Sequence, residues 1–196
     1  MVTNRRIGAE DSKSRAALLD ATEQIMVEEG YAAVSSRRIA QRAELKPPLV
    51  HYYFRTMDDL FLAAFRRRAE VGLEHLSKAL TSGRPVHAIW AFGDDPASTA
   101  LTMEFVALAN HRKVIRSEIA RYAELFRLKQ TEVLATVMAE RGIDTDRFPP
   151  VAVMTVMTSI SQILVLEESL GMATGHAETR ALVAGLLDDF GRGATA

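Results

Sequence analysis

The sequence of 196 residues lacks cysteine altogether, and no stretch of it alternates apolar and polar residues for long enough to indicate a β-strand. Without cysteine there can be no disulfide framework and no thiolate metal site. The five histidines are scattered, and none has a second histidine or a carboxylate at a spacing typical of metal ligation. These absences predict an all-α protein that holds no metal ion.

Motifs of enzymatic chemistry are also missing. The sequence has no glycine-rich phosphate loop, no Gly-x-Ser-x-Gly elbow and no cysteine nucleophile. Glu104 and Glu118 are carboxylates that could in principle pair in a pocket, but charges on a helix face or partners of arginine are the more ordinary interpretation. An enzyme on a helical scaffold therefore stays only as an alternative, and we expect no cofactor.

A membrane span is the competing explanation for residues 151–166, which include no charged side chain. The segment is shorter than the roughly 20 apolar residues that a span needs, and hydroxyl and amide side chains interrupt it. We therefore expect a soluble helix with the core on one face and a partner on the other.

Arg5 and Arg6 have no apolar run behind them, so we expect no secretory signal and a cytoplasmic protein. This basic pair could reach into a minor groove of DNA, although a disordered tail is the alternative.

Residues 34–61 predict two short helices joined by a tight turn. Ser35 or Ser36 can cap the first helix, in which residues 37–43 place apolar side chains on one side. The proline pair at 47–48 suits the first turn of a second helix, because backbone N–H groups there have no partner. Two short helices joined in this way form a helix-turn-helix.

Basic residues are concentrated in the same stretch. Between residues 35 and 55, five arginines and lysines stand against a single glutamate, a local balance of +4, whereas the whole chain has a net charge of −1. A basic segment that also bears aromatic residues is expected of a DNA-binding face, because phosphates need cations and hydroxyl donors. The alternative is a solvated helical hairpin.

Several short motifs between about Ala17 and Phe65 agree in spacing at once. They are Gly30-Tyr31, Ser35-Ser36, Arg38-Ile39-Ala40-Gln41-Arg42-Ala43, Tyr53-Phe54 and Met57-Asp58-Asp59-Leu60. Together they resemble the N-terminal signature of the tetracycline-repressor (TetR) family of bacterial transcriptional regulators. The resemblance implies a DNA-binding domain in this part of the chain. Beyond Arg68 only a compatible helical pattern is visible.

Three positions depart from the family pattern. The usual Ala-Gly-Val after the second helix is Ala43-Glu44-Leu45 here, so the turn lacks its common glycine. His51 stands where a phosphate-binding tyrosine is often found, and Met57 stands in place of a lysine that supplies a cation for phosphate. These changes leave the helical hairpin intact.

Ten residues form the predicted DNA-binding set. Arg37 is expected to pair with guanine in the major groove, and a proline or leucine at the start of the third helix is expected to touch a thymine methyl group. The other members are expected mostly to hold phosphates. The groove-facing residues are Arg37, Lys46, Pro47, Pro48 and Leu49, and the phosphate-binding residues are Ser35, Ser36, His51, Tyr52 and Tyr53.

Helical periodicity extends over the rest of the chain. Apart from a first helix that begins at Ser12 and ends before Gly30, the patterns predict helices over residues 57–80, 86–92, 97–110, 113–140, 151–166 and about 176–190. The arginines at 66–68 point around three sides of a helix, so we interpret them mainly as solvated cations. We expect a DNA-binding domain over residues 1–56 and a ligand-binding and dimerisation domain over residues 57–196.

The TetR resemblance implies a ligand cavity in the second domain, walled by aromatic and thioether side chains, although ordinary core packing is the alternative. A few polar residues would anchor the ligand. The candidates are Trp90, Phe92, Met103, Phe105, Val106, Asn110, Tyr122, Phe126, Met157, Thr158 and Gln162. In the family, the last two helices pair with their copies across a twofold axis into a four-helix bundle. The expected interface residues are Leu166, Leu182, Leu186 and Phe190.

The sequence therefore predicts a homodimeric transcriptional repressor that binds a palindromic DNA operator and is released by a mainly apolar small molecule. Release requires that the ligand binds one separation of the two recognition helices better than another. A DNA-binding protein that acts without any ligand is the alternative from a second class, beside the enzyme.

Overall fold

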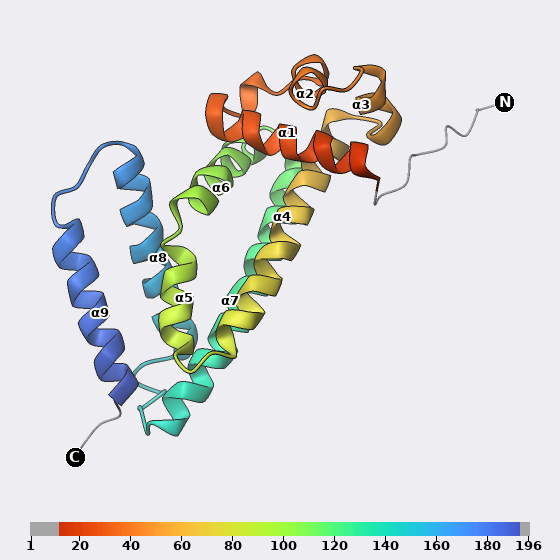
Figure 1. The fold of residues 1–196 in the computed structure, drawn as a ribbon. Helices are drawn as coiled ribbons and strands as arrows, with labels where there is room; N and C mark the ends of the chain where they lie inside the picture. Colours follow the sequence, from red (N-terminus) through yellow and green to blue (C-terminus); the bar gives the residue numbers. More distant parts are fainter. Residues whose placement is uncertain (1–11, 193–196) are drawn as a thin grey trace. The chain divides into compact units, whose positions relative to one another are not determined.

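The computed structural model describes residues 12–192 and the side chains of residues 12–189. Arg5, Arg6 and the side chain of Phe190 lie outside this described part. Within it the chain is helical and has no strand, which confirms the predicted all-α class (Figure 1). The elements are α1 (Lys13–Glu29), the 3-10 turn η1 (Tyr31–Ala33), α2 (Ser36–Arg42), α3 (Pro48–Tyr53), α4 (Met57–Leu80), α5 (Pro85–Gly93), α6 (Pro96–Ala109), α7 (Lys113–Glu140), α8 (Pro150–Ser169) and α9 (His176–Arg192).

Capping residues mark the ends of several helices. Ser12 caps α1 by accepting the N–H of Arg15 at 3.1 Å, and Gly30 ends the helix with φ of 84°, a conformation that glycine adopts readily. Thr56 and Asp59 cap α4 reciprocally, each side chain accepting the other residue's backbone N–H at 3.1 and 3.0 Å respectively. The capping residues can be recognised in the sequence. The helix order predicted from the sequence is confirmed.

The described chain forms two compact units. The first contains the described residues up to Glu70 together with Leu101–Arg121. Its core includes Leu18, Ile25, Ile39, Val50, Phe54, Leu60, Phe61, Phe105, Leu108 and Ile115. Phe65 meets Phe105 edge to face, with ring centroids 5.3 Å apart. Residues 101–121, distant in sequence from the helix-turn-helix, thus complete the core on which it rests.

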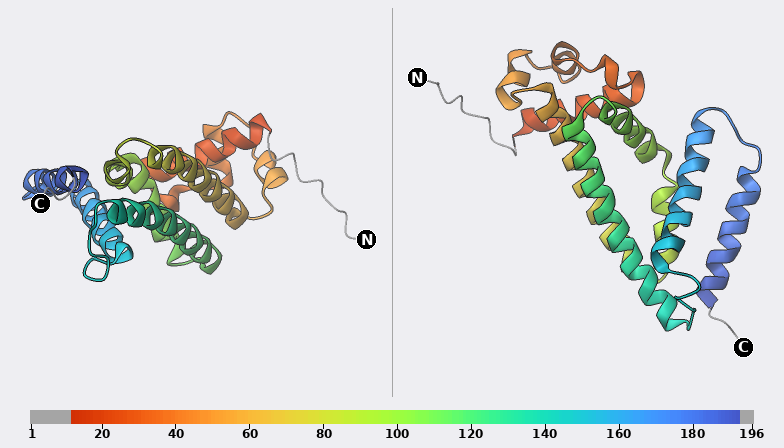
Figure 2. Two further views of the ribbon diagram at one scale, coloured as in Figure 1. Left: turned by 90° about the horizontal axis from the view of Figure 1, so that it is seen from below. Right: turned by 180° about the vertical axis from the view of Figure 1, so that it is seen from behind.

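The second unit contains Val71–Ala100 and the described residues from Tyr122 onward. Its core joins α5, α7, α8 and α9 through Val86, Ile89, Leu134, Met138, Met154, Val183 and Leu187. Helices α8 and α9 run in opposite directions on either side of their connecting loop (Figure 2). Helix α5 lies close against α8, because a Cβ atom on Gly93 would stand only 2.5 Å from Ser161 Oγ. The predicted boundary between residues 56 and 57 stays a prediction.

Helix α8 begins one residue before the predicted segment and continues three residues beyond it, to Ser169. By length and composition it could cross a membrane, and only 22% of its most apolar window is buried within the chain. Val151, Val156 and Ile163 are exposed on it. The expectation that core covers one face is met by the buried residues Met154, Ser161, Leu164 and Val165, while other positions of the helix are open in the single chain.

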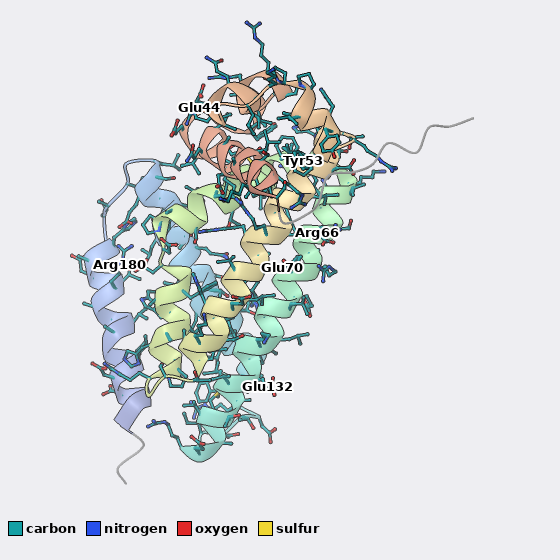
Figure 3. All side chains as sticks on the ribbon, turned by 45° about the vertical axis from the view of Figure 1, so that its right-hand side comes forward. Glu44, Tyr53, Arg66, Glu70, Glu132 and Arg180 are labelled. Atoms are coloured by element: carbon teal, nitrogen blue, oxygen red, sulfur yellow. The ribbon has the colours of Figure 1, made fainter. Side chains whose placement is uncertain are left out.

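The interpretation of the arginines at 66–68 as solvated cations was wrong for the first two. Arg66 Nε donates to Glu118 Oε1 at 2.7 Å, and Arg67 pairs with Asp20 at 2.7 Å and with Glu23 at 2.6 Å. Figure 3 shows Arg66 on the side of α4. Carboxylates on helices 44 to 52 residues away cannot be inferred from helical spacing. Glu118 is accordingly a partner of arginine, the more ordinary of the two interpretations.

Candidate nucleic-acid interface

The helix-turn-helix is held together by a small apolar core. Ile39 and Ala40 of α2 are buried with Val50 of α3 and with Phe54, which caps the C-terminal end of α3. The N–H of Leu45 donates to Ala40 O at 2.8 Å and closes the turn. The two helices therefore form one packed hairpin, as the sequence predicts.

Glu44 occupies the turn position at which the family pattern has glycine. Its φ is 54°, in the left-handed region that costs an L-residue of order 1 kcal/mol. It lies at the outer edge of the hairpin (Figure 3) and is exposed. The turn thus keeps the conformation that a glycine would favour, at the expense of local strain.

The basic residues of the hairpin divide into two groups. Arg38 pairs with Glu29, and Arg42 pairs with Glu28 at 2.7 Å and with Glu29 at 3.6 Å. Both arginines are thereby tied to the C-terminal end of α1. Arg37 is exposed and forms no ion pair with the described residues. Lys46 and Arg55 share this property, so these three cations are available for phosphates or base edges.

The N-terminal end of α3 is made of prolines, with Pro47 in the cap position and Pro48 as the first helical residue. Neither has an N–H, so this end of α3 presents the exposed apolar rings of two prolines in place of hydrogen-bond donors. His51 and Tyr52 are exposed, Tyr52 at 46%. Tyr53 is half-buried against the core and meets the ring of Tyr52 edge to face, with centroids 5.0 Å apart.

The two serines before α2 differ in role. Ser35 Oγ accepts the N–H of Arg38 at 3.4 Å and caps the helix, while Ser36 is its first residue. A hydroxyl that accepts one hydrogen bond still has its own O–H to donate. Ser35 can therefore cap α2 and donate to a phosphate at the same time. With Leu49 half-buried at the start of α3, the ten predicted residues all lie on the hairpin of α2 and α3.

The predicted effector residues fall in both units. Met103, Phe105, Val106 and Asn110 belong to the first, and Trp90, Phe92, Tyr122, Phe126, Met157, Thr158 and Gln162 belong to the second. Phe105 is a fully buried core residue, whereas Asn110 and Gln162 are exposed. Within the second unit, Phe92 and Phe126 lie 5.5 Å apart between ring centroids. Gln130, which the sequence analysis did not single out, is buried there at 4% exposure.

A pocket of about 660 Å³ opens elsewhere in the second unit. None of the predicted effector residues lines it. Its lining combines the loop before α5 with the C-terminal parts of α7 and α9, and includes Arg84, His87, Arg141 and Asp188. His87 Nε2 lies 3.0 Å from Asp188 Oδ1, and this hydrogen bond, followed by the charge of Arg84, lowers the pKa of the Asp188 carboxyl.

Two of the predicted interface residues, Leu182 and Leu186, lie on an exposed face of α9. Leu182 and Leu186 are 63% and 58% exposed, while Val183 and Leu187 are buried in the core of the second unit. Leu166 on α8 is half-buried. An apolar face that stays open in the single chain indicates a surface for a partner.

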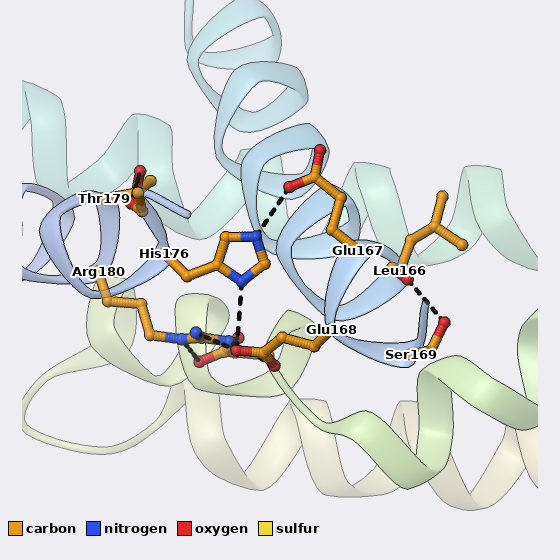
Figure 4. A network of polar contacts seen from close by, with 9 residues as sticks. Leu166, Glu167, Glu168, Ser169, His176, Thr179 and Arg180 are labelled. Atoms are coloured by element: carbon orange, nitrogen blue, oxygen red, sulfur yellow. Dashed lines mark hydrogen bonds and ion pairs between the residues drawn. The ribbon is translucent and has the colours of Figure 1, made fainter. Parts of the chain in front are cut away.

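A polar network fixes the hairpin of α8 and α9 (Figure 4). His176 is buried, with Nε2 at 2.8 Å from Glu167 Oε2 and Nδ1 at 3.4 Å from Glu168 Oε1. Arg180 also binds Glu168, and this hydrogen bond, followed by the one from His176, lowers the pKa of the Glu168 carboxyl. Among the described residues, no group of three histidine, aspartate or glutamate side chains could hold a metal ion.

The arrangement of α1 to α3 defines a helix-turn-helix DNA-binding protein of the all-α class. Residues 18–64 match the family described as bacterial regulatory proteins, tetR family. The chain therefore carries the DNA-binding domain of the TetR family, and it has the fold of a TetR-family transcriptional regulator. No curated protein matches the chain.

Solved structures share this fold over nearly the whole chain. A TetR-family regulator from Rhodococcus sp. is 18% identical, with a TM-score of 0.72 over 92% of this chain and 100% of that one. A TetR regulator from Haloarcula marismortui is 20% identical, with a TM-score of 0.72 over 90% and 96%. A regulator from Saccharomonospora viridis, in complex with choline, is 16% identical, with a TM-score of 0.75 over 92% and 96%.

Proposed function

We propose that the protein is a cytoplasmic, homodimeric transcriptional repressor that binds a palindromic operator and is released by a mainly apolar small molecule. In this proposal residues 1–56 bind DNA, and residues 57–196 hold the effector and form the dimer. The observation that carries it is the pair of exposed cations Arg37 and Lys46, which lie at the starts of the two hairpin helices and form no ion pair with the described residues.

Recognition of DNA needs both base contacts and phosphate contacts. Arg37 presents a planar guanidinium that can bind guanine O6 and N7 together, and the apolar surface of Pro47 and Pro48 suits a thymine methyl group. Ser35, Ser36, His51, Tyr52 and Tyr53 supply hydroxyl, imidazole and phenol groups for the flanking phosphates. Because Arg38 and Arg42 are tied to α1, the two arginines stabilise the hairpin rather than contact DNA.

A dimer follows from the small reach of one recognition helix, which contacts only a few base pairs. Two copies related by a twofold axis double the contacts and require a palindromic site. The exposed apolar residues of α8 and α9, among them Val156, Ile163, Leu182 and Leu186, offer the surface for this pairing. Burial of such residues would contribute about 25 cal/mol for each Å² of apolar surface.

Effector binding is supported by the half-buried rings of Phe92 and Phe126, which pack against each other in the second unit, and by the buried polar side chain of Gln130 in the same unit. Two structures that share the fold contain small organic molecules, choline in the Saccharomonospora viridis regulator and imidazole in a multidrug-binding protein. A regulator that binds DNA without any effector is the second candidate. It is favoured if no small molecule changes the affinity for DNA.

The test begins with selection of 30-base-pair duplexes from a random pool by the wild-type protein. We expect an enriched palindrome, bound by two chains and weakened by added salt, because phosphate contacts release counterions. Small apolar and aromatic compounds that bind the protein by calorimetry are then titrated into the complex. Failure to enrich any sequence would reject the DNA-binding proposal. An enriched sequence with one half-site would reject the palindrome alone.

A further inference from the structure

A single carboxylate from α6 reaches the connection between α1 and α2. Glu104 Oε2 accepts the backbone N–H of Tyr31 at 2.7 Å, across 73 positions of sequence. Both residues belong to the first unit. Glu104 and Tyr31 are each partly buried, so the bond is partly shielded from bulk water. A hydrogen bond between a charged acceptor and a backbone donor is stronger than a neutral one.

The chain between α1 and α2 needs an external acceptor for one backbone N–H. Gly30 leaves the helical conformation and returns its own N–H to Met26 O at 3.0 Å. In the 3-10 turn that follows, the first internal hydrogen bond comes from the N–H of Ala33 to Gly30 O at 3.1 Å. The N–H of Tyr31 lies between these bonds, at a helix start where backbone donors have no local acceptor. The Glu104 carboxylate satisfies it from outside.

The bond lies directly upstream of the DNA-binding helices. The N–H of Val34 donates to Tyr31 O at 3.2 Å, and the next residue, Ser35, caps α2. Side chains of Tyr31 and Val34 also pack against the core of the first unit. Tyr31 is therefore held at its N–H by α6 and at its carbonyl by the residue that precedes the cap. Arg37 follows only two residues after Ser35.

We propose that Glu104 is a positioning residue for DNA recognition, which sets where α2 begins and thereby where Arg37 points. The inference rests on the proposed DNA binding and deepens it, because it assigns a role in recognition to a residue outside residues 1–56. Glu104 acts through the backbone of Tyr31 and touches no DNA. Its loss frees the α1–α2 connection, although every DNA-contacting side chain is still present in the variant.

The experiment compares Glu104→Ala and Glu104→Gln with Glu132→Gln, an exposed glutamate of α7 labelled in Figure 3. Hydrogen exchange at the Tyr31 amide reports the bond itself. Affinity is measured for the duplex that the wild-type protein selects and for a random duplex. Thermal unfolding, together with exchange in α1 and α4, shows whether the fold is kept.

We expect Glu104→Ala to speed exchange at the Tyr31 amide at least about tenfold and to weaken binding of the selected duplex about tenfold. Affinity for random DNA changes less, because the phosphate-binding side chains are all present. Glu104→Gln keeps an acceptor oxygen without the charge, so both effects are intermediate, and this variant serves if the alanine variant does not fold. Glu132→Gln behaves like the wild type.

Two results would overturn the inference alone. One is wild-type exchange at the Tyr31 amide in both Glu104 variants, and the other is faster exchange with unchanged affinity for the selected duplex. A wild-type protein that selects no duplex would instead reject the proposed DNA binding, and the inference with it. The wild-type measurement therefore distinguishes failure of the inference from failure of the proposed DNA binding.

Discussion

Arg180 of α9 holds the Asp94 carboxylate at the C-terminal end of α5, with Nη2 to Oδ1 at 3.0 Å and Nε to Oδ2 at 3.3 Å. The same guanidinium binds Glu168 at the end of α8. Hydrogen bonds that Arg180 donates to Glu168 and then to Asp94 raise the pKa of Arg180, so it is charged at every accessible pH. One side chain thus ties three helices of the second unit together.

Replacement of Arg180 by methionine should therefore destabilise the second unit while preserving the apolar stem of the side chain. The expected loss in the free energy of unfolding is about 1 kcal/mol, because the network is partly exposed and solvent screens it. Lys78→Met, at an exposed position with no ion pair to the described residues, is the matched control and should change stability little. Urea unfolding measures both. Equal effects of the two substitutions would contradict the structural role of Arg180.

Glu118 gives a pH-dependent contribution to stability. Hydrogen bonds from Arg121 and then from Arg66 lower the pKa of Glu118 from 4.5 to about 2. Since the folded pKa lies below the unfolded value, the contribution is fully present above pH 4.5 and is lost as the pH falls through about 2. The free energy of unfolding of Glu118→Gln should be lower than that of the wild type by about 1 to 2 kcal/mol at neutral pH, after allowance for solvent screening of the exposed arginines.

This difference should shrink steadily below about pH 5, as the carboxyl of the wild type becomes protonated in the unfolded state. Chemical denaturation at several pH values measures it. Glu132→Gln is the control, because Glu132 is exposed and forms no ion pair with the described residues, and it should change the free energy of unfolding little. A Glu118→Gln difference that persists undiminished in acid would mean that packing, and not charge, makes the contribution.

Glu44→Gly should stabilise the hairpin. Glu44 has φ of 54°, and glycine adopts this conformation without a steric penalty. The gain is expected to be about 0.5 to 1 kcal/mol, since the greater freedom of glycine in the unfolded chain offsets part of the relief. Glu44→Gln removes the charge but keeps the Cβ, so it separates an electrostatic effect from a conformational one. Thermal unfolding of both variants checks this, and a stabilised glutamine variant would point to charge.

The sequence was sufficient to predict those helices whose ends are marked by residues at the ends themselves. The cap at Ser12, the glycine at 30 and the proline at 48 set helix ends within a few residues, so the helix order could be predicted. The hydrogen bond from Tyr31 to Glu104 could not be, because no periodicity links residues 73 positions apart. For the same reason the sequence could not show that Arg38 and Arg42 pair with carboxylates of α1.

The two groups of arginines give a direct test of DNA recognition. Arg37→Ala should weaken binding of the selected duplex by about 1 to 3 kcal/mol and relax specificity at one base pair. Arg42→Ala should lose an exposed ion pair worth at most about 1 kcal/mol of stability and leave specificity intact. Binding titrations with single-base variants of the duplex distinguish them. If Arg37→Ala loses affinity equally for selected and random DNA, Arg37 contacts phosphate instead of a base.

The last prediction concerns the dimer. Leu182 and Leu186 expose more than half of their surface on α9, while Val183 and Leu187 anchor the adjacent face in the core. Glutamate at both exposed positions should therefore leave the chain folded but place charges in the middle of the proposed interface, where burial without a partner is costly. The double variant should sediment as a monomer at micromolar concentration in moderate salt.

Leu128→Glu on α7 is the matched control, because Leu128 is 57% exposed but lies outside α8 and α9. It should stay dimeric. The double variant should also lose most of its affinity for the full palindrome while binding a single half-site like the wild type, since each recognition helix is intact and only the second set of contacts is lost. A wild-type protein that is monomeric under these conditions, or a Leu128→Glu variant that dissociates equally, would contradict an interface formed by the last two helices.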